Sequence, residues 1–159
     1  MDDLYRTDLA GATTGTFVAD GWWDISVANI KAEVAAGQKT YATIQFGHND
    51  MKVAPPESMG QNITVMIKTI RSLGAEPILI TPITRRGFNT NGTVADTLQP
   101  WADITKKVAK EQKTHLLDLH EESVKYIEAI GEDAAHRLNK SPTDNTRMCS
   151  DPLFPTVCP

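Results

Sequence analysis

The segment at positions 47–50 combines residue types that acyl-transfer chemistry requires. It reads Gly47, His48, Asn49 and Asp50, and it directly follows an apolar, β-branched run. Glycine permits a tight turn and lets a substrate approach the backbone closely. An asparagine amide can direct its N–H at an oxyanion as the charge develops. Gly, Asn and Asp are also ordinary turn residues, so the segment alone fits a plain turn equally well.

A second segment, at positions 10–17, reads Ala-Gly-Ala-Thr-Thr-Gly-Thr-Phe. Small residues of this kind form turns whose backbone N–H groups can face an anion. The alternative interpretation is a flexible N-terminal loop. Both segments depend on the regular elements around them to hold them in place.

The hydrophobic pattern predicts those elements. A helix is expected over 20–37, with Asp20 as its N-cap and Gly37 as its left-handed end. A strand follows at 40–46, and then a helix that ends at Gly74. The nearly continuous apolar run at 77–83 is typical of a parallel strand buried on both faces.

The same alternation continues through the second half of the chain. We expect a polar loop at 85–93, a helix over 97–112, a strand over 115–119, and a helix that ends at Gly131, followed by a helical turn around 134–138. Alternating strands and helices indicate a parallel sheet with right-handed crossovers. Ligands of such sheets bind at the carboxyl ends of the strands, which here are the segments 47–50 and 81–86 and the residue His120.

The order of these segments resembles that of the SGNH (GDSL-type) hydrolases, and most closely the rhamnogalacturonan acetylesterase group. Residues 10–17 followed by Ile-Gln-Phe-Gly-His-Asn-Asp at 44–50 look like the second and third blocks of that family. The run Thr-Pro-Ile-Thr-Arg-Arg-Gly-Phe at 81–88 strengthens the likeness, as does Leu-Asp-Leu-His at 117–120 with Ser123. The resemblance extends from about Leu9 to Thr146.

The resemblance implies a three-layer α/β/α fold with a parallel, flavodoxin-like sheet, and a Ser-His-Asp mechanism without a cofactor. It implies an oxyanion hole made of the serine N–H, the Gly11 N–H and the Asn49 side chain. Gly47 and His48 would line the substrate site. The substrate would be an acylated polysaccharide or a small ester.

The chain departs from the family pattern at two catalytic positions. It contains no Gly-Asp-Ser, so the first block and its nucleophile are absent from the printed residues. Near the other end, Asp144 matches the triad acid, but Arg147 stands where the family has histidine. Arginine stays protonated and cannot act as a base. The resemblance therefore leaves one triad member of three, and we expect the chain as printed to be inactive.

These departures predict a chain truncated at both ends. We expect a partial SGNH domain over 1–146, without its first strand and final helix, and an unmatched coil tail over 147–159. The sudden loss of likeness within one motif favours an altered reading frame or splice junction. In the family the missing strand lies beside the one predicted at 40–46, which would become an unpaired edge. Marginal stability or self-association through that edge is the expected consequence.

Other residues have both a functional and a structural interpretation. His48 or His120 could replace the missing base, but Ser58 and Ser123 fall in predicted helices, so we do not expect such rescue. Arg85 and Arg86 could bind the carboxylates of a pectic substrate in bidentate fashion, or they could be a solvated pair. For Trp22, Trp23 and Trp101 we expect core packing rather than a sugar platform. The histidines show no metal-ligand spacing, and Cys149 and Cys158 receive no role.

Composition excludes several classes of partner. Sixteen basic and 20 acidic residues give a formal charge of −4 over 159 residues. No basic stripe suggests nucleic-acid binding, and no apolar run has the length of a membrane span. The family is usually secreted, yet the N-terminus does not resemble a signal peptide, so the localisation stays unassigned. The alternatives are a non-catalytic carbohydrate-binding remnant and a flavodoxin-like or receiver-type domain. The latter would need a phosphate-binding glycine loop or an acidic cluster at the strand ends, and this sequence shows neither.

Overall fold

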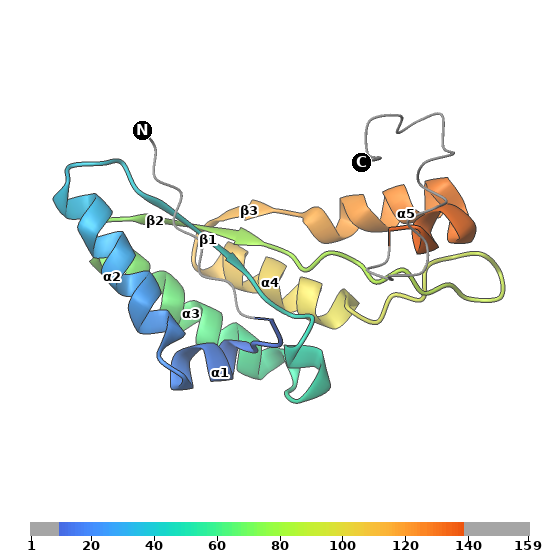
Figure 1. Cartoon of the computed structure of the whole chain (residues 1–159), viewed down its shortest axis with the longest axis horizontal. Helices are drawn as coiled ribbons and strands as arrows, with labels where there is room; N and C mark the ends of the chain where they lie inside the picture. Colours follow the sequence, from blue (N-terminus) through green and yellow to red (C-terminus); the bar gives the residue numbers. More distant parts are fainter. Residues whose placement is uncertain (1–9, 139–159) are drawn as a thin grey trace, which may run out of the picture. The chain divides into compact units, whose positions relative to one another are not determined.

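The computed structural model describes residues 10–138, which divide into two compact units (Figure 1). Within the described range, the first unit holds residues 10–83 and 97–120, and the second holds 84–96 and 121–138. The elements are, in chain order, α1 (Thr14–Ala19), α2 (Trp22–Ala35), β1 (Tyr41–Gln45), the 3₁₀ turn η1 (Asp50–Lys52), α3 (Pro56–Ser72), β2 (Glu76–Ile80), α4 (Gln99–Glu111), β3 (His115–Leu117) and α5 (Leu119–His136).

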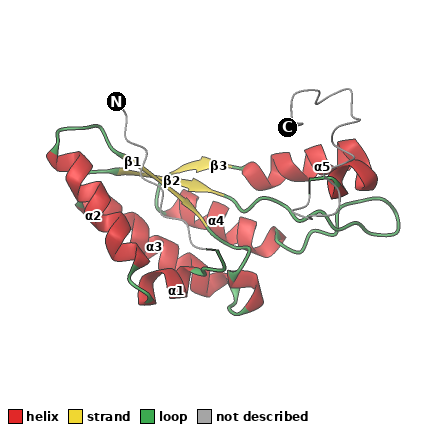
Figure 2. Ribbon diagram, in the orientation of Figure 1, coloured by secondary structure: helices red, strands yellow, loops and turns green. Residues whose placement is uncertain are grey.

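The three strands form one parallel sheet in the order β1-β2-β3 (Figure 2). Ile44 pairs with Leu79, and Leu79 pairs with Leu116, so one row of side chains crosses the whole sheet. The α/β class with a parallel sheet is confirmed. Because the strands are parallel, their carboxyl ends meet at one edge of the sheet, and the loops that follow them converge there.

The core of the first unit lies on one face of this sheet. Inward-facing Ala42, Ile44 and Phe46 follow the period of a strand, and Leu79 of β2 lies beside them. The helices add their apolar faces, above all α3, whose fully buried residues contribute about 1.5–3 kcal/mol each. These residues of α3 are Met59, Ile63, Met66, Ile67 and Ile70.

The prediction that the strand at 77–83 is buried on both faces is wrong. β2 covers Glu76–Ile80, and only Pro77 and Leu79, which point toward the core, are buried. On the opposite face Ile78 and Ile80 are half-buried, and Leu117 of β3 is 55% exposed. A continuous apolar run cannot distinguish these two environments, because it contains no polar residue to mark the less buried face.

Two helix starts differ from expectation. Residues 14–19, part of a segment predicted as a turn or loop, form α1, whose N-cap Thr13 makes a reciprocal capping box with Thr16. Asp20 ends α1 instead of capping α2, which begins after Gly21 in a left-handed conformation. The predicted stops are correct: Gly37 and Gly74 have positive φ, and a non-helical Gly131 interrupts α5.

β1 is the edge strand of the described sheet, and it pairs with β2 alone within residues 10–138. No helix in that range is long and apolar enough to cross a membrane. The tryptophans are packing residues, as expected: Trp22, Trp23 and Trp101 lie against the core of the first unit.

The second unit is built around α5 from Glu121 onward and the loop at 84–96. Its small core contains Val94, Ile127 and Ala135. Two hydrogen bonds hold the loop to the helix: the Thr84 N–H donates to Ser123 Oγ at 2.9 Å, and the Val94 N–H donates to Glu128 Oε1 at 3.0 Å. The loop turns back on itself through an antiparallel bridge between Phe88 and Val94.

Candidate active site

Gly47 lets the chain turn sharply at the carboxyl end of β1. Its φ is +130°, a conformation that side chains disfavour. A Cβ at this position would lie 3.0 Å from Cγ of Pro82 and 3.4 Å from Cβ of Trp101. Glycine is therefore required both by its backbone conformation and by the space available. The turn leads directly into His48, Asn49 and η1.

The Asn49 side chain contacts the small-residue loop that precedes α1. Its Nδ2 donates to the carbonyl oxygen of Ala12 at 3.1 Å, although the two residues are 37 positions apart. Gly11, next to Ala12, is exposed and has φ of +87°. The structure thus places Asn49 against the loop that carries Gly11, and these are the two residues that the resemblance assigns to an oxyanion hole. Neither the Gly11 N–H nor the second Asn49 N–H has a partner within residues 10–138.

A buried cluster of hydrogen-bonded polar side chains connects the loop after β1 to the start of α1. Oδ1 of Asp50 accepts hydrogen bonds from the Thr14 N–H at 2.9 Å and from the Thr14 hydroxyl at 2.7 Å. Asn62 of α3 donates to the Thr14 hydroxyl oxygen at 2.9 Å. Asp50 and Thr14 are each 1% exposed. Hydrogen bonds to a charged group in such a setting are stronger than neutral ones, so this cluster holds η1 rigidly against the start of α1.

Sequence reasoning missed the structural roles of Asp50, Thr14 and Asn62. Asp50 was part of the predicted motif, but nothing in the local pattern identified a hydroxyl 36 positions earlier as its partner. The one available signal was the pair Thr13 and Thr14 shortly before the apolar Phe17 and Val18. That signal indicates a helix start, but it does not indicate which distant group satisfies the threonine.

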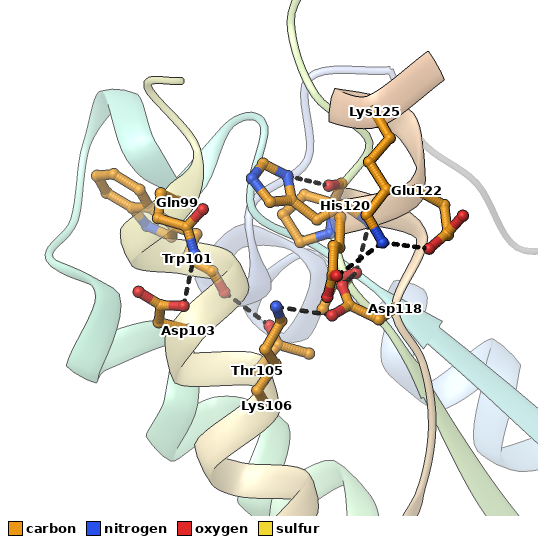
Figure 3. A network of polar contacts seen from close by, with 12 residues as sticks. Gln99, Trp101, Asp103, Thr105, Lys106, Asp118, His120, Glu122 and Lys125 are labelled. Carbon is orange, nitrogen blue, oxygen red and sulfur yellow. Dashed lines mark hydrogen bonds and ion pairs between the residues drawn. The ribbon is translucent and has the colours of Figure 1, made fainter. Parts of the chain in front are cut away.

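A second polar cluster lies at the carboxyl ends of β2 and β3 (Figure 3). Thr81 is fully buried; its hydroxyl donates to Oδ1 of Asp118 at 2.9 Å and accepts from the His120 N–H at 2.8 Å. The other oxygen of Asp118 pairs with Nζ of Lys106 on α4 at 2.6 Å. These contacts join β2, β3 and α4 at the edge where the candidate site lies.

His120 does not end a strand, contrary to the prediction. It lies in the first turn of α5, is 1% exposed, and its Nδ1 lies 2.9 Å from the carbonyl oxygen of Pro82. A carbonyl can only accept, so the ring donates from Nδ1. The burial of His120 argues against its use as a substitute base. Ser123 is equally constrained, since its Oγ accepts from the Thr84 N–H.

The remaining predicted residues fall elsewhere. His48 is half-buried beside Asn49. Arg85 and Arg86 are half-buried in the second unit, and each takes part in polar interactions. Asp144 and Arg147 lie outside the described residues. Within the described range, no group of three or more His, Cys, Asp or Glu side chains could hold a metal ion.

Comparison with known proteins gives consistent matches. The profile of the GDSL-like Lipase/Acylhydrolase family matches residues 3–155. The rhamnogalacturonan acetylesterase RhgT of Bacillus subtilis (strain 168) is 34% identical over 131 residues, which are 80% of this chain and 54% of that protein. The probable rhamnogalacturonan acetylesterase YesY of the same strain is 27% identical over 135 residues, which are 80% of this chain and 59% of that protein. The chain thus spans somewhat more than half the length of these relatives.

A structural comparison gives the same fold. The crystal structure of the Bacillus subtilis protein YXIM matches with a TM-score of 0.64 and 24% sequence identity. The match covers 79% of this chain and 35% of that one. At this level of identity the likeness concerns the fold alone.

Proposed function

Because the chain belongs to the GDSL-like lipase/acylhydrolase family, we propose that it is part of an esterase that removes acetyl groups from a pectic polysaccharide of the rhamnogalacturonan type. The names of the two Bacillus subtilis relatives support this substrate class. The observation that carries the proposal is the hydrogen bond from Asn49 to Ala12, because Ala12 directly follows Gly11, the other candidate oxyanion donor.

In the proposed mechanism a serine oxygen attacks the ester carbonyl, and a histidine takes the serine proton. The carbonyl oxygen becomes an oxyanion, which accepts hydrogen bonds from the Gly11 N–H and the free N–H of Asn49. The intermediate then collapses, the bond between the carbonyl carbon and the sugar oxygen breaks, and the histidine gives its proton to that oxygen, which leaves as a hydroxyl group. Water then hydrolyses the acetyl-serine, releasing acetate and restoring the serine. Asp144 is proposed to orient the histidine.

We further propose that the 159 printed residues do not hydrolyse esters by themselves. They contain no Gly-Asp-Ser, and Arg147 occupies the position of the family histidine. The proposed boundary at residue 146, between the partial domain and the tail, rests on this motif argument alone. The family match does not define it, because that match continues to residue 155. Activity would require a serine and a histidine that these residues do not supply.

A complementation experiment tests these proposals. A chimera would carry a Gly-Asp-Ser segment ahead of residue 10 together with Arg147→His, and acetate release from acetylated rhamnogalacturonan would be measured. We expect release by the chimera and none by the chain alone. Asn49→Ala in the chimera should lower the rate by about 10²–10³-fold, whereas Asn29→Ala on α2 should not. A folded chimera without activity would contradict the proposed function, and release by the chain alone would contradict its inactivity.

A non-catalytic carbohydrate-binding remnant is the second candidate. It is favoured by the combination of intact donors at Gly11 and Asn49 with an arginine at 147. Titration calorimetry with acetylated and deacetylated pectin fragments distinguishes the two candidates. A remnant binds the acetylated fragments without releasing acetate, and its affinity falls when Arg85 and Arg86 are replaced by alanine.

We also propose that the chain self-associates through the edge of β1 that pairs with no strand within residues 10–138, because unpaired backbone groups on an edge strand favour pairing with another strand. Sedimentation velocity should show a dimer fraction that rises with concentration. Strong hydrogen-exchange protection, in a monomer, of those β1 amides that face away from β2 would contradict this proposal.

A further inference from the structure

We propose that Lys52 is a positioning residue that orients and polarises the amide of Asn49. Its Nζ donates to Oδ1 of Asn49 at 3.0 Å. The inference rests on the proposed function, in which Asn49 donates to the oxyanion. Lys52 would thus be a charged residue of the proposed oxyanion site, and none of the predicted motifs included it.

The 3₁₀ turn brings Lys52 to Asn49. Asn49 is the N-cap of η1, and the Lys52 N–H donates to the Asn49 carbonyl oxygen at 3.0 Å. A 3₁₀ helix has three residues per turn, so the side chains at i and i+3 lie directly above one another. The ammonium group therefore lies over the Asn49 amide as a consequence of backbone geometry. In an α-helical turn the two side chains would be offset around the axis.

Two contacts of opposite polarity select one orientation of the Asn49 amide. Nδ2 faces the carbonyl oxygen of Ala12, an acceptor, and Oδ1 faces the ammonium of Lys52, a donor. Flipping the amide would place oxygen against oxygen and N–H against ammonium, so both contacts would become repulsive. In the observed orientation the second N–H of Nδ2 has no partner within residues 10–138 and remains available to an oxyanion.

Lys52 also strengthens that N–H as a donor. A cation on the oxygen of an amide draws electron density away from its nitrogen, and hydrogen bonds linked in this way polarise one another. The positive charge itself lies one amide group away from the proposed oxyanion. Both effects favour negative charge at the site.

Amide NMR spectra of the full ¹⁵N-labelled chain test the orientation. Lys52→Met should shift the two Nδ2 proton resonances of Asn49, and Lys52→Arg, which keeps a charged donor, should restore them. Lys68→Met, at an exposed lysine of α3, is the matched control and should leave them unchanged. Backbone amides outside 47–54 report that the fold is intact. Unchanged Asn49 resonances in Lys52→Met, or an equal shift in Lys68→Met, would overturn the proposal.

Acetate, the product anion, serves as the probe of polarisation. Added acetate should shift the Gly11 amide and the Asn49 side-chain signals, and Lys52→Met should weaken its binding about two- to fivefold, as expected for one exposed charge. Equal acetate affinity in Lys52→Met and the wild type would overturn the polarising role. If acetate shifts neither signal in the wild-type chain, the proposed function loses its support, while the orienting role is still decided by the Asn49 resonances.

Discussion

The substitution Thr14→Val probes the cluster that holds the two halves of the proposed oxyanion site together. Valine has nearly the shape of threonine but no hydroxyl. It removes the 2.7 Å hydrogen bond to Asp50 and the 2.9 Å hydrogen bond from Asn62, and it keeps the backbone N–H that also donates to Asp50. The burial of Thr14 means that water cannot readily replace these contacts.

The expected loss of stability follows from the two hydrogen bonds of the Thr14 hydroxyl that the substitution removes. A hydrogen bond to a charged group contributes about 1.5–3 kcal/mol and a neutral one about 0.5–1.5 kcal/mol, so the free energy of unfolding should fall by about 2–4 kcal/mol. The upper part of this range is favoured because Asp50 Oδ2 is already buried without a partner among the described residues. Thr14→Ser keeps the hydroxyl and should lose only about 1 kcal/mol from the missing methyl group.

Urea unfolding measures this loss. With a slope of about 2 kcal/mol/M, Thr14→Val should lower the midpoint by about 1–2 M. Thr69→Val is the matched control, because the Thr69 hydroxyl is exposed and donates only to the Val65 carbonyl of its own helix. It should change the free energy by less than about 0.5 kcal/mol. If Thr14→Val were as stable as Thr69→Val, the contacts of Thr14 with Asp50 and Asn62 would not exist in solution.

Three further predictions concern stability. Gly47→Ala should lower the free energy of unfolding by about 2–5 kcal/mol, because it combines a strained φ with contacts at 3.0 Å. Gly92→Ala has a strained φ but no close neighbour, so it should lower that free energy by about 1–2 kcal/mol. Equal losses in urea unfolding would refute the steric contribution at Gly47. Lys106→Met removes the 2.6 Å ion pair with Asp118 and should lower the free energy of unfolding by about 1–2 kcal/mol. Lys107→Met removes the exposed pair with Glu111 and should lower it by less than about 0.5 kcal/mol, and thermal unfolding measures both losses. Hydrogen bonds from Lys125 to Glu121 and Glu122 raise the Lys125 pKa above its ordinary 10.5. Because the pKa is higher in the folded state than in the unfolded state, the charged Lys125 contributes its full stabilisation at any pH well below 10.5. The difference in stability between the wild type and Lys125→Met should therefore be constant near neutral pH and should disappear as the pH rises above about 10.5.

Because the pattern of apolar residues is set by local geometry, sequence periodicity predicted most elements of the first unit. The helix α1, which lies in a segment expected to be a turn or loop, was not among them. The strand beginning near Tyr41, the helix ending at Gly74 and the left-handed stop at Gly37 were all predicted from spacing and turn residues. The motif at 47–50 likewise pointed to Asn49 as a candidate donor. These predictions depend on residues only a few positions apart, which is the range over which backbone geometry imposes a pattern.

Tertiary structure decided which distant groups meet. Asp50 reaches Thr14, Asn49 reaches Ala12, and His120 is buried against Pro82, and each pair is more than 35 positions apart in the chain. Such partners depend on the path of the chain between them and on which polar groups are withdrawn from water, and neither is encoded in a local pattern. The residue types of the proposed oxyanion site were thus evident from the sequence, whereas the contact between their two loops follows from the path of the chain and the buried hydrogen bonds that connect the loops.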